Sequence, residues 1–172
     1  MTTVLDVQRF KEEGQRFAVL TAYDYLSAKI LDEAGIPILL VGDSLGMVML
    51  GYPTTLPVTM DEMIHHAKAV ARGAHQALLV GDMPFMSYHA SVEQAITSAG
   101  RFIQQGGMHA VKLEGSGRIV EITQRSTRWA ASRSRARATS RRRASFPTPR
   151  SSSRRERSAS FWRVCLRISR PG

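Results

Sequence analysis

The stretch Leu39-Leu40-Val41-Gly42-Asp43 returns unchanged as Leu78-Leu79-Val80-Gly81-Asp82. A short continuous aliphatic run is typical of a strand that is buried on both faces of a parallel sheet. Each run ends in a glycine and a carboxylate, and parallel α/β folds bind their ligands at the carboxyl ends of strands. The repeat therefore predicts two parallel strands with functional groups at their ends.

The segments on either side of the repeat alternate between apolar runs and amphipathic patterns. Further strands are predicted at residues 17–24 and at 109–114. A lead-in helix is predicted at residues 4–13. The next helix is expected to bury a face at helical spacing and to end at Gly35. That face consists of Leu26, Ile30, Leu31 and Ala34.

Two more helices are predicted from capping patterns, a hydroxyl residue followed three positions later by Glu or Gln. Thr59 and Glu62 begin one helix, and Ser91 and Gln94 begin the other. Apolar stripes follow each pattern, and Gly106 and Gly107 end the second helix. They consist of Met60, Met63, Ile64, Ala67 and Val70, and of Val92, Ala95, Ile96, Ala99 and Ile103.

This order of strands and helices predicts an α/β fold with a parallel sheet and right-handed crossovers. The expected strand ends at Asp24, Asp43, Asp82 and Glu114 are 19, 39 and 32 residues apart. Eight such units need about 250 residues and close into a (β/α)₈ TIM barrel. We therefore expect about the first four β/α units of such a barrel in residues 1–125.

Charge separates the chain into two regions. Residues 1–125 carry 10 Lys and Arg against 13 Asp and Glu, whereas residues 126–172 carry 14 arginines, no lysine and one acid. The second region has no apolar periodicity, so we expect it to be disordered. An Arg/Ser/Ala/Pro mixture without lysine is typical of a GC-rich gene translated out of frame, or of a truncated pseudogene product.

The alternative interpretation of residues 126–172 is an arginine/serine-rich arm that binds nucleic acid. Its aromatic residues, Trp129, Phe161 and Trp162, would then stack on bases. We regard nucleic acid as the less favoured partner. The single cysteine, Cys165, excludes a disulfide within the chain, and no run reaches the ~18 apolar residues of a membrane span, so we expect a soluble, cytoplasmic protein.

Three carboxylates follow the aliphatic runs, namely Asp43, Asp82 and Glu114. Neighbouring strand ends lie about 5 Å apart, so these groups can converge, and a hard divalent cation would relieve their repulsion. Oxygen ligands without His or Cys favour Mg²⁺. The alternative is that each acid caps the next helix, and for Asp24 that is the favoured interpretation.

Other residues near the strand ends have more than one possible role. Gly42 and Gly81 would let the backbone bend or a ligand approach closely. Lys112 is expected on the same side of its strand as Glu114, where it is either an ion-pair partner or a cation for an anionic substrate. The histidines lack ligand spacing, and we interpret all five as structural or surface residues. They are His65, His66, His75, His89 and His109.

Five ordered motifs resemble the ketopantoate hydroxymethyltransferase family, also called 3-methyl-2-oxobutanoate hydroxymethyltransferase. They are "TAYDY" (21–25), "VGDSLGM" (41–47), "TLPVT" (55–59), "GDMPFMSY" (81–88) and "VKLEG" (111–115). The resemblance covers residues 1 to about 125. It implies a barrel of the phosphoenolpyruvate/pyruvate type, a homo-oligomer, and the first committed step of pantothenate synthesis.

The resemblance also implies roles for site residues. Asp43, Asp82 and Glu114 would hold Mg²⁺, and Asp43, Ser44, Asp82 and Lys112 would bind the 2-oxoacid. Mg²⁺ would act as a Lewis acid on 3-methyl-2-oxobutanoate, which takes a one-carbon unit from 5,10-methylenetetrahydrofolate and gives 2-dehydropantoate. The alternative enzyme is another Mg²⁺-dependent 2-oxoacid lyase or aldolase of the same barrel type.

The chain departs from the family in its second part. Nothing in residues 126–172 matches the family's proton-accepting glutamate or its "GHLGLTPQ" motif, and we do not assign that role to the one acid there, Glu156. A reaction of this kind needs a general base. We therefore expect the chain as written to be inactive and poorly folded, with exposed sheet edges that favour aggregation.

Overall fold

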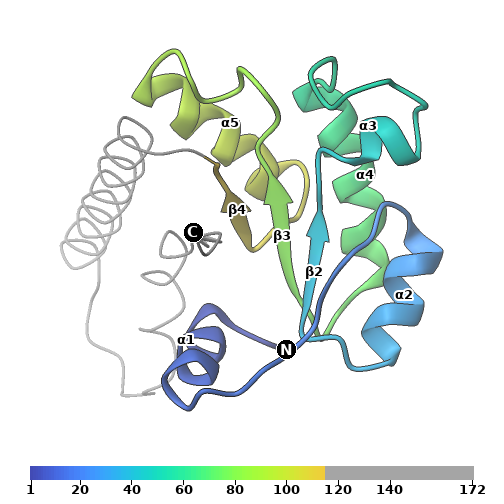
Figure 1. Cartoon of the computed structure of the whole chain (residues 1–172), viewed down its shortest axis with the longest axis vertical. Helices are drawn as coiled ribbons and strands as arrows, with labels where there is room; N and C mark the ends of the chain where they lie inside the picture. The colour runs from blue at the N-terminus through green and yellow to red at the C-terminus, as the bar shows by residue number, and fades with distance from the viewer. Residues whose placement is uncertain (115–172) are drawn as a thin grey trace, which may run out of the picture.

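Four parallel strands follow one another across the sheet in their order along the chain, β1-β2-β3-β4. This computed structural model describes residues 1–114. The strands are β1 (Val19–Thr21), β2 (Ile38–Val41), β3 (Leu78–Asp82) and β4 (Ala110–Lys112). Figure 1 shows β2, β3 and β4 side by side, with the carboxyl ends of β2 and β3 pointing upward. All four predicted strands are present, although β1 is shorter than the predicted run 17–24.

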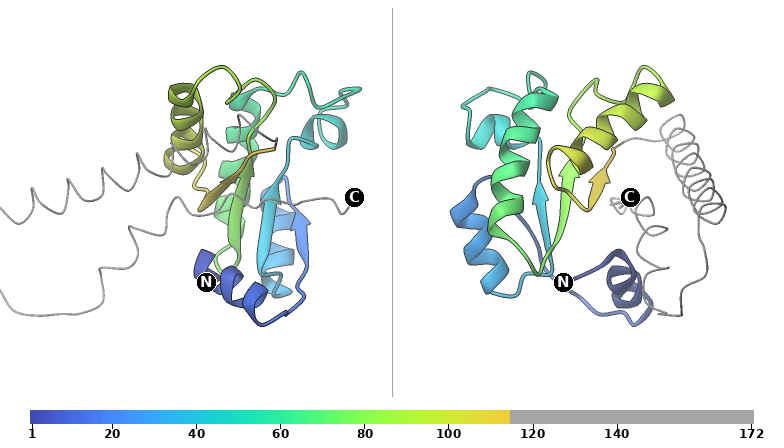
Figure 2. Two further views of the ribbon diagram at one scale, coloured as in Figure 1. Left: turned by 60° about the vertical axis from the view of Figure 1, so that its left-hand side comes forward. Right: turned by 180° about the vertical axis from the view of Figure 1, so that it is seen from behind.

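The crossover helices lie on one side of the sheet. They are α2 (Tyr25–Glu33), α4 (Met60–Gly73) and α5 (Val92–Gln104). Seen from behind in Figure 2, they cover the near side of the strands. A doubly wound sheet carries helices on both faces, whereas a (β/α)₈ barrel keeps them all outside. Sequential strand order with helices on one side is therefore the arrangement of a barrel segment.

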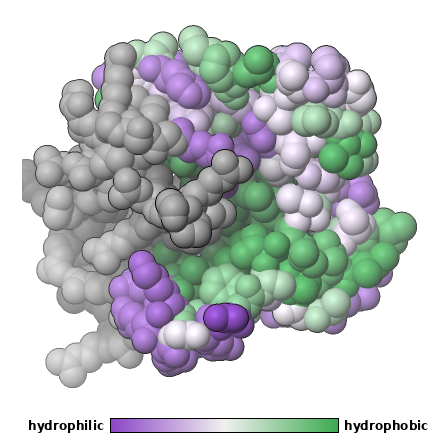
Figure 3. Space-filling view, in the orientation of Figure 1, coloured by the Kyte–Doolittle hydropathy of each residue, from purple (hydrophilic) through white to green (hydrophobic). Residues whose placement is uncertain are grey.

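Each face of the sheet is covered by its own hydrophobic cluster. Leu39, Val41 and Leu79 pack with the crossover helices. Ile38, Leu78, Val80 and Ala110 pack in a second cluster with Val7 of α1 (Val4–Glu12), the predicted lead-in helix. In Figure 3 hydrophobic surface extends beside the hydrophilic region of α1. We call the face covered by α1 the inner face and the face covered by α2, α4 and α5 the outer face.

The two copies of Leu-Leu-Val-Gly-Asp lie one residue out of step. Leu39 pairs with Leu79, and Val41 pairs with Gly81. Side chains alternate between faces along a strand, so equivalent residues of the two copies face opposite sides. Val41 belongs to the outer cluster and Val80 to the inner cluster.

The predicted buried face of α2 is partly wrong. Leu26 and Ile30 are 63% and 56% exposed, whereas Ala28 and Asp32 are buried. The reason is a close contact with α4, where a Cβ added to Gly73 would meet the Tyr25 carbonyl oxygen and the Ala28 Cβ. Only small side chains fit between the two helices, so the longer aliphatic residues turn outward.

Most predicted helix caps are confirmed. The Asp24 side chain accepts from the Ser27 N–H, and Thr59 and Glu62 form a full capping box. Ser91 caps α5, but Gln94 accepts from the Ala90 N–H rather than from the Ser91 N–H, so the second pattern is only half of a box. The stripe of α5 also includes the buried Phe102, which the prediction omitted.

A short extra helix, α3 (Leu45–Val48), follows β2. None of the helices in residues 1–114 has the length and apolar content that a membrane crossing needs. The helix of the fourth expected β/α unit, the boundary at residue 125 and the basic region 126–172 lie outside the described residues.

Candidate functional site

Asp82 and Lys112 form the centre of the candidate site. They are paired positions at the carboxyl ends of β3 and β4, so their side chains share the inner face. The Lys112 ammonium donates to both carboxylate oxygens of Asp82, at 2.9 and 2.8 Å. It also donates to Glu114 Oε1 at 2.5 Å. The predicted alternation of Lys112 and Glu114 on one side of the strand is confirmed.

The three side chains differ strongly in exposure. Asp82 and Lys112 are 7% and 12% exposed, whereas Glu114 is 72% exposed. A buried, doubly hydrogen-bonded ion pair is costly to separate because each charge would lose its partner away from water. Asp82 and Lys112 therefore form the rigid part of the site, and Glu114 is its solvent-facing part.

One ammonium faces more than one negative charge. Burial raises the pKa of Asp82 to about 6; Lys112 opposes this shift, and the charges of Asp43 and Glu114 add to it. Burial alone would lower the pKa of Lys112, but its contacts with Asp82 and Glu114 outweigh burial and raise it. Burial is thus the main cause of the shift at Asp82, and the neighbouring carboxylates are the cause of the shift at Lys112. Because one ammonium faces three carboxylates, the site favours a further positive charge.

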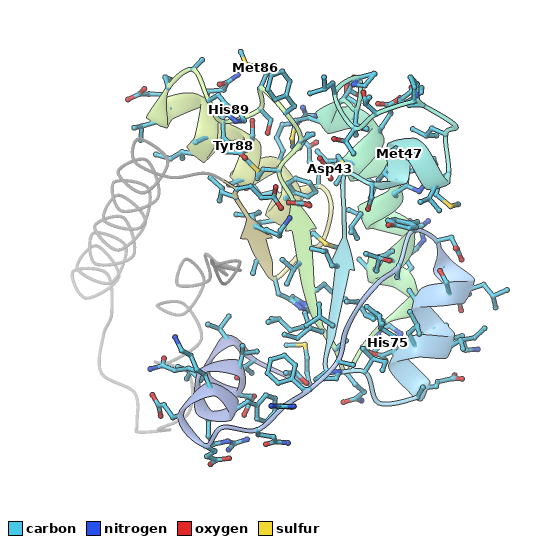
Figure 4. The ribbon with its side chains drawn as sticks, in the orientation of Figure 1. Asp43, Met47, His75, Met86, Tyr88 and His89 are labelled. Atoms are coloured by element: carbon cyan, nitrogen blue, oxygen red, sulfur yellow. The ribbon has the colours of Figure 1, made fainter. Side chains whose placement is uncertain are left out.

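Asp43 and Ser44 lie at the end of β2, next to Asp82. Figure 4 shows Asp43 at the same upper end of the sheet as Tyr88. A Cβ added to Gly42 would lie 2.9 Å from Ser44 Oγ and 3.9 Å from Asp82 Oδ2. Gly42 therefore lies beside both the Ser44 hydroxyl and the Asp82 carboxylate, and close approach of a ligand there stays a prediction.

Gly81, in contrast, has a packing role. A Cβ there would meet the Phe102 ring at 2.5 to 3.0 Å. Gly81 lies on the outer face, where Phe102 of α5 is fully buried against the sheet. The prediction that Gly81 admits a ligand is therefore wrong, because helix α5 occupies that position.

The carboxylates do not form a closed metal cage. Within residues 1–114, no three His, Cys, Asp or Glu side chains are grouped as metal ligands. The donor set still fits Mg²⁺, which is held by one or two carboxylates together with water and substrate oxygens. The excess of negative charge around Asp82 supports that fit.

Two tyrosines connect the strand ends. The Tyr23 hydroxyl and Ser44 Oγ are 2.8 Å apart. Tyr88 is buried, and its hydroxyl donates to the Glu114 carbonyl at 2.9 Å and accepts from the Glu114 N–H at 3.1 Å. The loops after β1 and β3 thus hold the residues that follow β2 and β4.

Neither tyrosine was predicted as a functional residue. Tyr23 directly precedes the capping residue Asp24 in "TAYDY", and Tyr88 ends "GDMPFMSY". Their proximity to strand ends was the only available signal, because which neighbour each phenol would meet depends on the order of strands in the sheet.

The histidines lie at separate places. His109 Nδ1 accepts from the Leu79 N–H, and burial lowers the pKa of His109, which favours this neutral acceptor. His66 Nδ1 lies 2.6 Å from the Tyr23 carbonyl oxygen. His65 and His75 are exposed, and His89 accepts from the Met86 N–H. Two histidines touch a residue that contacts a predicted ligand-binding group. His66 contacts Tyr23, which contacts Ser44, and the His89 ring packs against Tyr88, which contacts Glu114.

The sequence of the chain is similar to a known protein family and to individual members of it. Residues 1–130 match the family described as ketopantoate hydroxymethyltransferase. The chain is 57% identical over 124 residues to 3-methyl-2-oxobutanoate hydroxymethyltransferase from Dehalococcoides mccartyi, covering 72% of this chain and 44% of that protein. For the protein of the same name from Chloroflexus aggregans, the identity is 60% over 114 residues, covering 66% and 40%. The chain spans less than half the length of these relatives.

Solved structures share the fold. A phosphonopyruvate hydrolase in complex with oxalate and Mg²⁺ has a TM-score of 0.54 at 16% identity, covering 68% of this chain and 40% of that chain. A 2,3-dimethylmalate lyase, a member of the PEP mutase/isocitrate lyase superfamily, has a TM-score of 0.51 at 19% identity, covering 68% and 38%. The predicted fold, the first part of a TIM barrel, is confirmed.

Proposed function

Because the chain belongs to the ketopantoate hydroxymethyltransferase family, we propose that residues 1–114 carry the metal- and 2-oxoacid-binding part of that family's active site. The reaction would transfer a hydroxymethyl group from 5,10-methylenetetrahydrofolate to 3-methyl-2-oxobutanoate and give 2-dehydropantoate. The observation that carries the proposal is the buried Asp82–Lys112 pair, with Asp43, Ser44 and Glu114 at the same edge of the sheet.

Asp43 and Asp82, supported by Glu114, are the residues that would hold Mg²⁺. When bound, Mg²⁺ supplies Lewis-acid polarisation of the keto group, which makes the neighbouring C–H more acidic. The structural relative with bound oxalate and Mg²⁺ supports the proposal, because oxalate has two adjacent oxygen-bearing carbons, as a 2-oxoacid does.

Lys112 has two tasks in this proposal. It balances the charge of Asp82 within the protein, and its ammonium provides a cation beside the place where an anionic substrate would lie. Ser44 would donate its hydroxyl proton to a carboxylate oxygen of the substrate. Burial of Asp82 and Lys112 strengthens these electrostatic contacts, because the effective dielectric is lower there than in water.

The remaining steps need residues outside the described range. We expect the chain as written to turn over poorly or not at all, because no residue in its sequence matches the family's proton-accepting glutamate. The homo-oligomer, the cytoplasmic location and the folate contacts also stay predictions. Whether another 2-oxoacid lyase activity is present would be decided by assaying one-carbon transfer with and without the folate donor.

Calorimetric titration with 3-methyl-2-oxobutanoate tests the binding proposal directly. We expect binding to the full 172-residue chain in the presence of Mg²⁺ and none in EDTA. Asp82→Asn should abolish the Mg²⁺-dependent binding, because it removes the buried carboxylate at the centre of the site.

The matched control is Glu33→Gln, which neutralises an exposed carboxylate at the end of α2 that forms only a long ion pair with Lys29. This variant should bind like the wild type. Binding that is indifferent to Mg²⁺, or an Asp82→Asn variant that retains it, would contradict the proposed site.

A further inference from the structure

Three residues from different elements are joined at the end of β1. Tyr23 follows β1, Ser44 follows β2, and His66 lies in the middle of α4. The Tyr23 hydroxyl is 2.8 Å from Ser44 Oγ, and His66 Nδ1 is 2.6 Å from the Tyr23 carbonyl oxygen. A carbonyl can only accept, so Nδ1 of His66 carries a proton and donates it.

Ser44 does not use its hydroxyl in the ordinary way. It stands at the N-cap position of α3, where serine usually accepts from a backbone N–H of the first turn. Here its side chain makes no capping hydrogen bond. The hydroxyl is instead directed to Tyr23, and Ser44 Oγ and Asp82 Oδ2 both lie next to Gly42, 2.9 and 3.9 Å from the position that a Cβ there would take.

The acidity of the two hydroxyls indicates the direction of this hydrogen bond. A phenol is a stronger acid than an alcohol, so the Tyr23 O–H is the better donor and Ser44 Oγ the better acceptor. The Ser44 proton is then free to be donated elsewhere. Donation by Tyr23 also makes the Ser44 O–H a stronger donor, since successive hydrogen bonds polarise one another.

Tyr23 is held in place on both sides. Its ring packs against the outer hydrophobic cluster, and its carbonyl accepts from His66. The phenol oxygen is therefore already positioned before any ligand binds. Pre-positioned groups of this kind reduce the entropy that binding would otherwise cost.

We propose that Tyr23 is a positioning residue of the 2-oxoacid site, which holds the Ser44 hydroxyl so that its proton points at a carboxylate oxygen of the substrate. This inference rests on the proposed function. It goes beyond that function by adding Tyr23, which touches neither metal nor substrate, and His66, which fixes the backbone of Tyr23.

A double-mutant cycle with Tyr23→Phe and Ser44→Ala tests the inference. Tyr23→Phe removes only the hydroxyl and should weaken 3-methyl-2-oxobutanoate binding by about three- to tenfold, the value of one net hydrogen bond. The Mg²⁺ dissociation constant and the urea midpoint should stay at wild-type values. In the Ser44→Ala background, Tyr23→Phe should have no further effect on ligand binding.

Tyr25→Phe is the matched control, because it removes a phenol hydroxyl from an exposed tyrosine of the same motif. It should leave ligand affinity unchanged. Failure of the wild type to bind 3-methyl-2-oxobutanoate would overturn the proposed function and this inference with it. Wild-type binding with an unaffected Tyr23→Phe variant would overturn the inference alone. A Tyr23→Phe variant that lowers the urea midpoint and the Mg²⁺ affinity together would show that the tyrosine is purely structural.

Discussion

The first copy of Leu-Leu-Val-Gly-Asp, residues 39–43, and the second, β3, share every residue but not their surroundings. In the first copy the glycine faces the candidate site, and Asp43 lies just beyond the end of β2. In the second copy the glycine packs against Phe102, and Asp82 is the last residue of the strand, buried beside Lys112. A one-residue offset in strand pairing is enough to exchange the roles of the two glycines.

The comparison teaches that a repeated sequence need not mean a repeated site. Each copy supplies one glycine and one carboxylate, but the open glycine comes from the first copy and the buried carboxylate from the second. The candidate site combines these complementary halves at one edge of the sheet.

The largest expected difference between the copies concerns Asp82. Its pKa is raised from 3.8 to about 6 by burial, so the native state binds this proton more tightly than the unfolded chain does. The contribution of this proton to the free energy of unfolding is fully present below about pH 3.8 and is lost as pH rises through about 6. In EDTA, the free energy of unfolding of the wild type relative to Asp82→Asn should therefore fall by about 2 kcal/mol between about pH 4 and pH 7.5.

Urea unfolding at a series of pH values would measure this difference. Asp43→Asn, the equivalent change in the first copy, is the comparison variant. Equal pH dependence for the two variants would mean that the two carboxylates have equivalent environments, contrary to the structure.

A buried carboxylate holds the backbone segment 75–77, which leads into the second copy of Leu-Leu-Val-Gly-Asp. Asp32 at the end of α2 accepts from the backbone N–H groups of His75, Gln76 and Ala77, just before Leu78. Burial acts to raise the pKa of Asp32, but these three donors outweigh it and lower the pKa. Asp32→Asn should reduce the free energy of unfolding at pH 7 by about 2 kcal/mol, because an amide cannot accept all three bonds.

The pH dependence of this effect has the opposite sign to that of Asp82. The stabilisation by Asp32 is present above about pH 3.8 and is lost as pH falls through its lower native pKa. Chemical denaturation of the wild type and of Asp32→Asn at pH 7 and pH 3 would measure this change in the difference between their free energies of unfolding. If the Asp32→Asn variant is as stable as the wild type at pH 7, the hydrogen bonds of Asp32 do not stabilise this loop.

The two glycines give the smallest but most selective test. Gly81→Ala should lower the free energy of unfolding by about 1 to 2 kcal/mol, because the added methyl group overpacks the buried Phe102 ring. Gly42→Ala should change stability by less than about 0.5 kcal/mol, since it displaces only the end of the Ser44 side chain. For 3-methyl-2-oxobutanoate affinity, only Gly42→Ala should cause a loss.

A second variant makes this test independent of general instability. In a Phe102→Leu background, the cost of Gly81→Ala should decrease, because the smaller side chain leaves room for the methyl group. Melting curves of the four proteins would measure the coupling. If Gly42→Ala proves the more destabilising substitution in the wild-type background, the assignment of the two glycines is reversed.

Much of the described fold follows from local patterns. The aliphatic runs correctly predict β2 and β3, and Thr59 with Glu62 correctly predicts the start of α4. Helix α2 shows the limit, because Leu26 and Ile30 have the spacing of a buried face and are nevertheless exposed. The contact that excludes them depends on Gly73, more than forty residues away, and no local pattern reports it.

The candidate site divides in the same way. Asp43, Asp82 and Glu114 were recognisable because polar groups at strand ends are unusual after apolar runs, and Lys112 because it alternates with Glu114. Tyr23 and Tyr88 were not recognisable as functional residues. Their partners, Ser44 and Glu114, follow the strands next to those that Tyr23 and Tyr88 follow, so the relation exists only after the sheet has formed.

The sequence by itself determined that each copy of Leu-Leu-Val-Gly-Asp contains a strand with a carboxylate at or just beyond its end, since burial of aliphatic side chains and solvation of charge are local requirements. Only the tertiary structure decided the pairing of Leu39 with Leu79, and with it the glycine that faces the site. In this pairing Gly81 lies on the outer face, where Phe102 of α5 packs against it. Because side chains alternate with a period of two, that single residue of offset separates a glycine that faces the candidate site from a glycine that packs against α5.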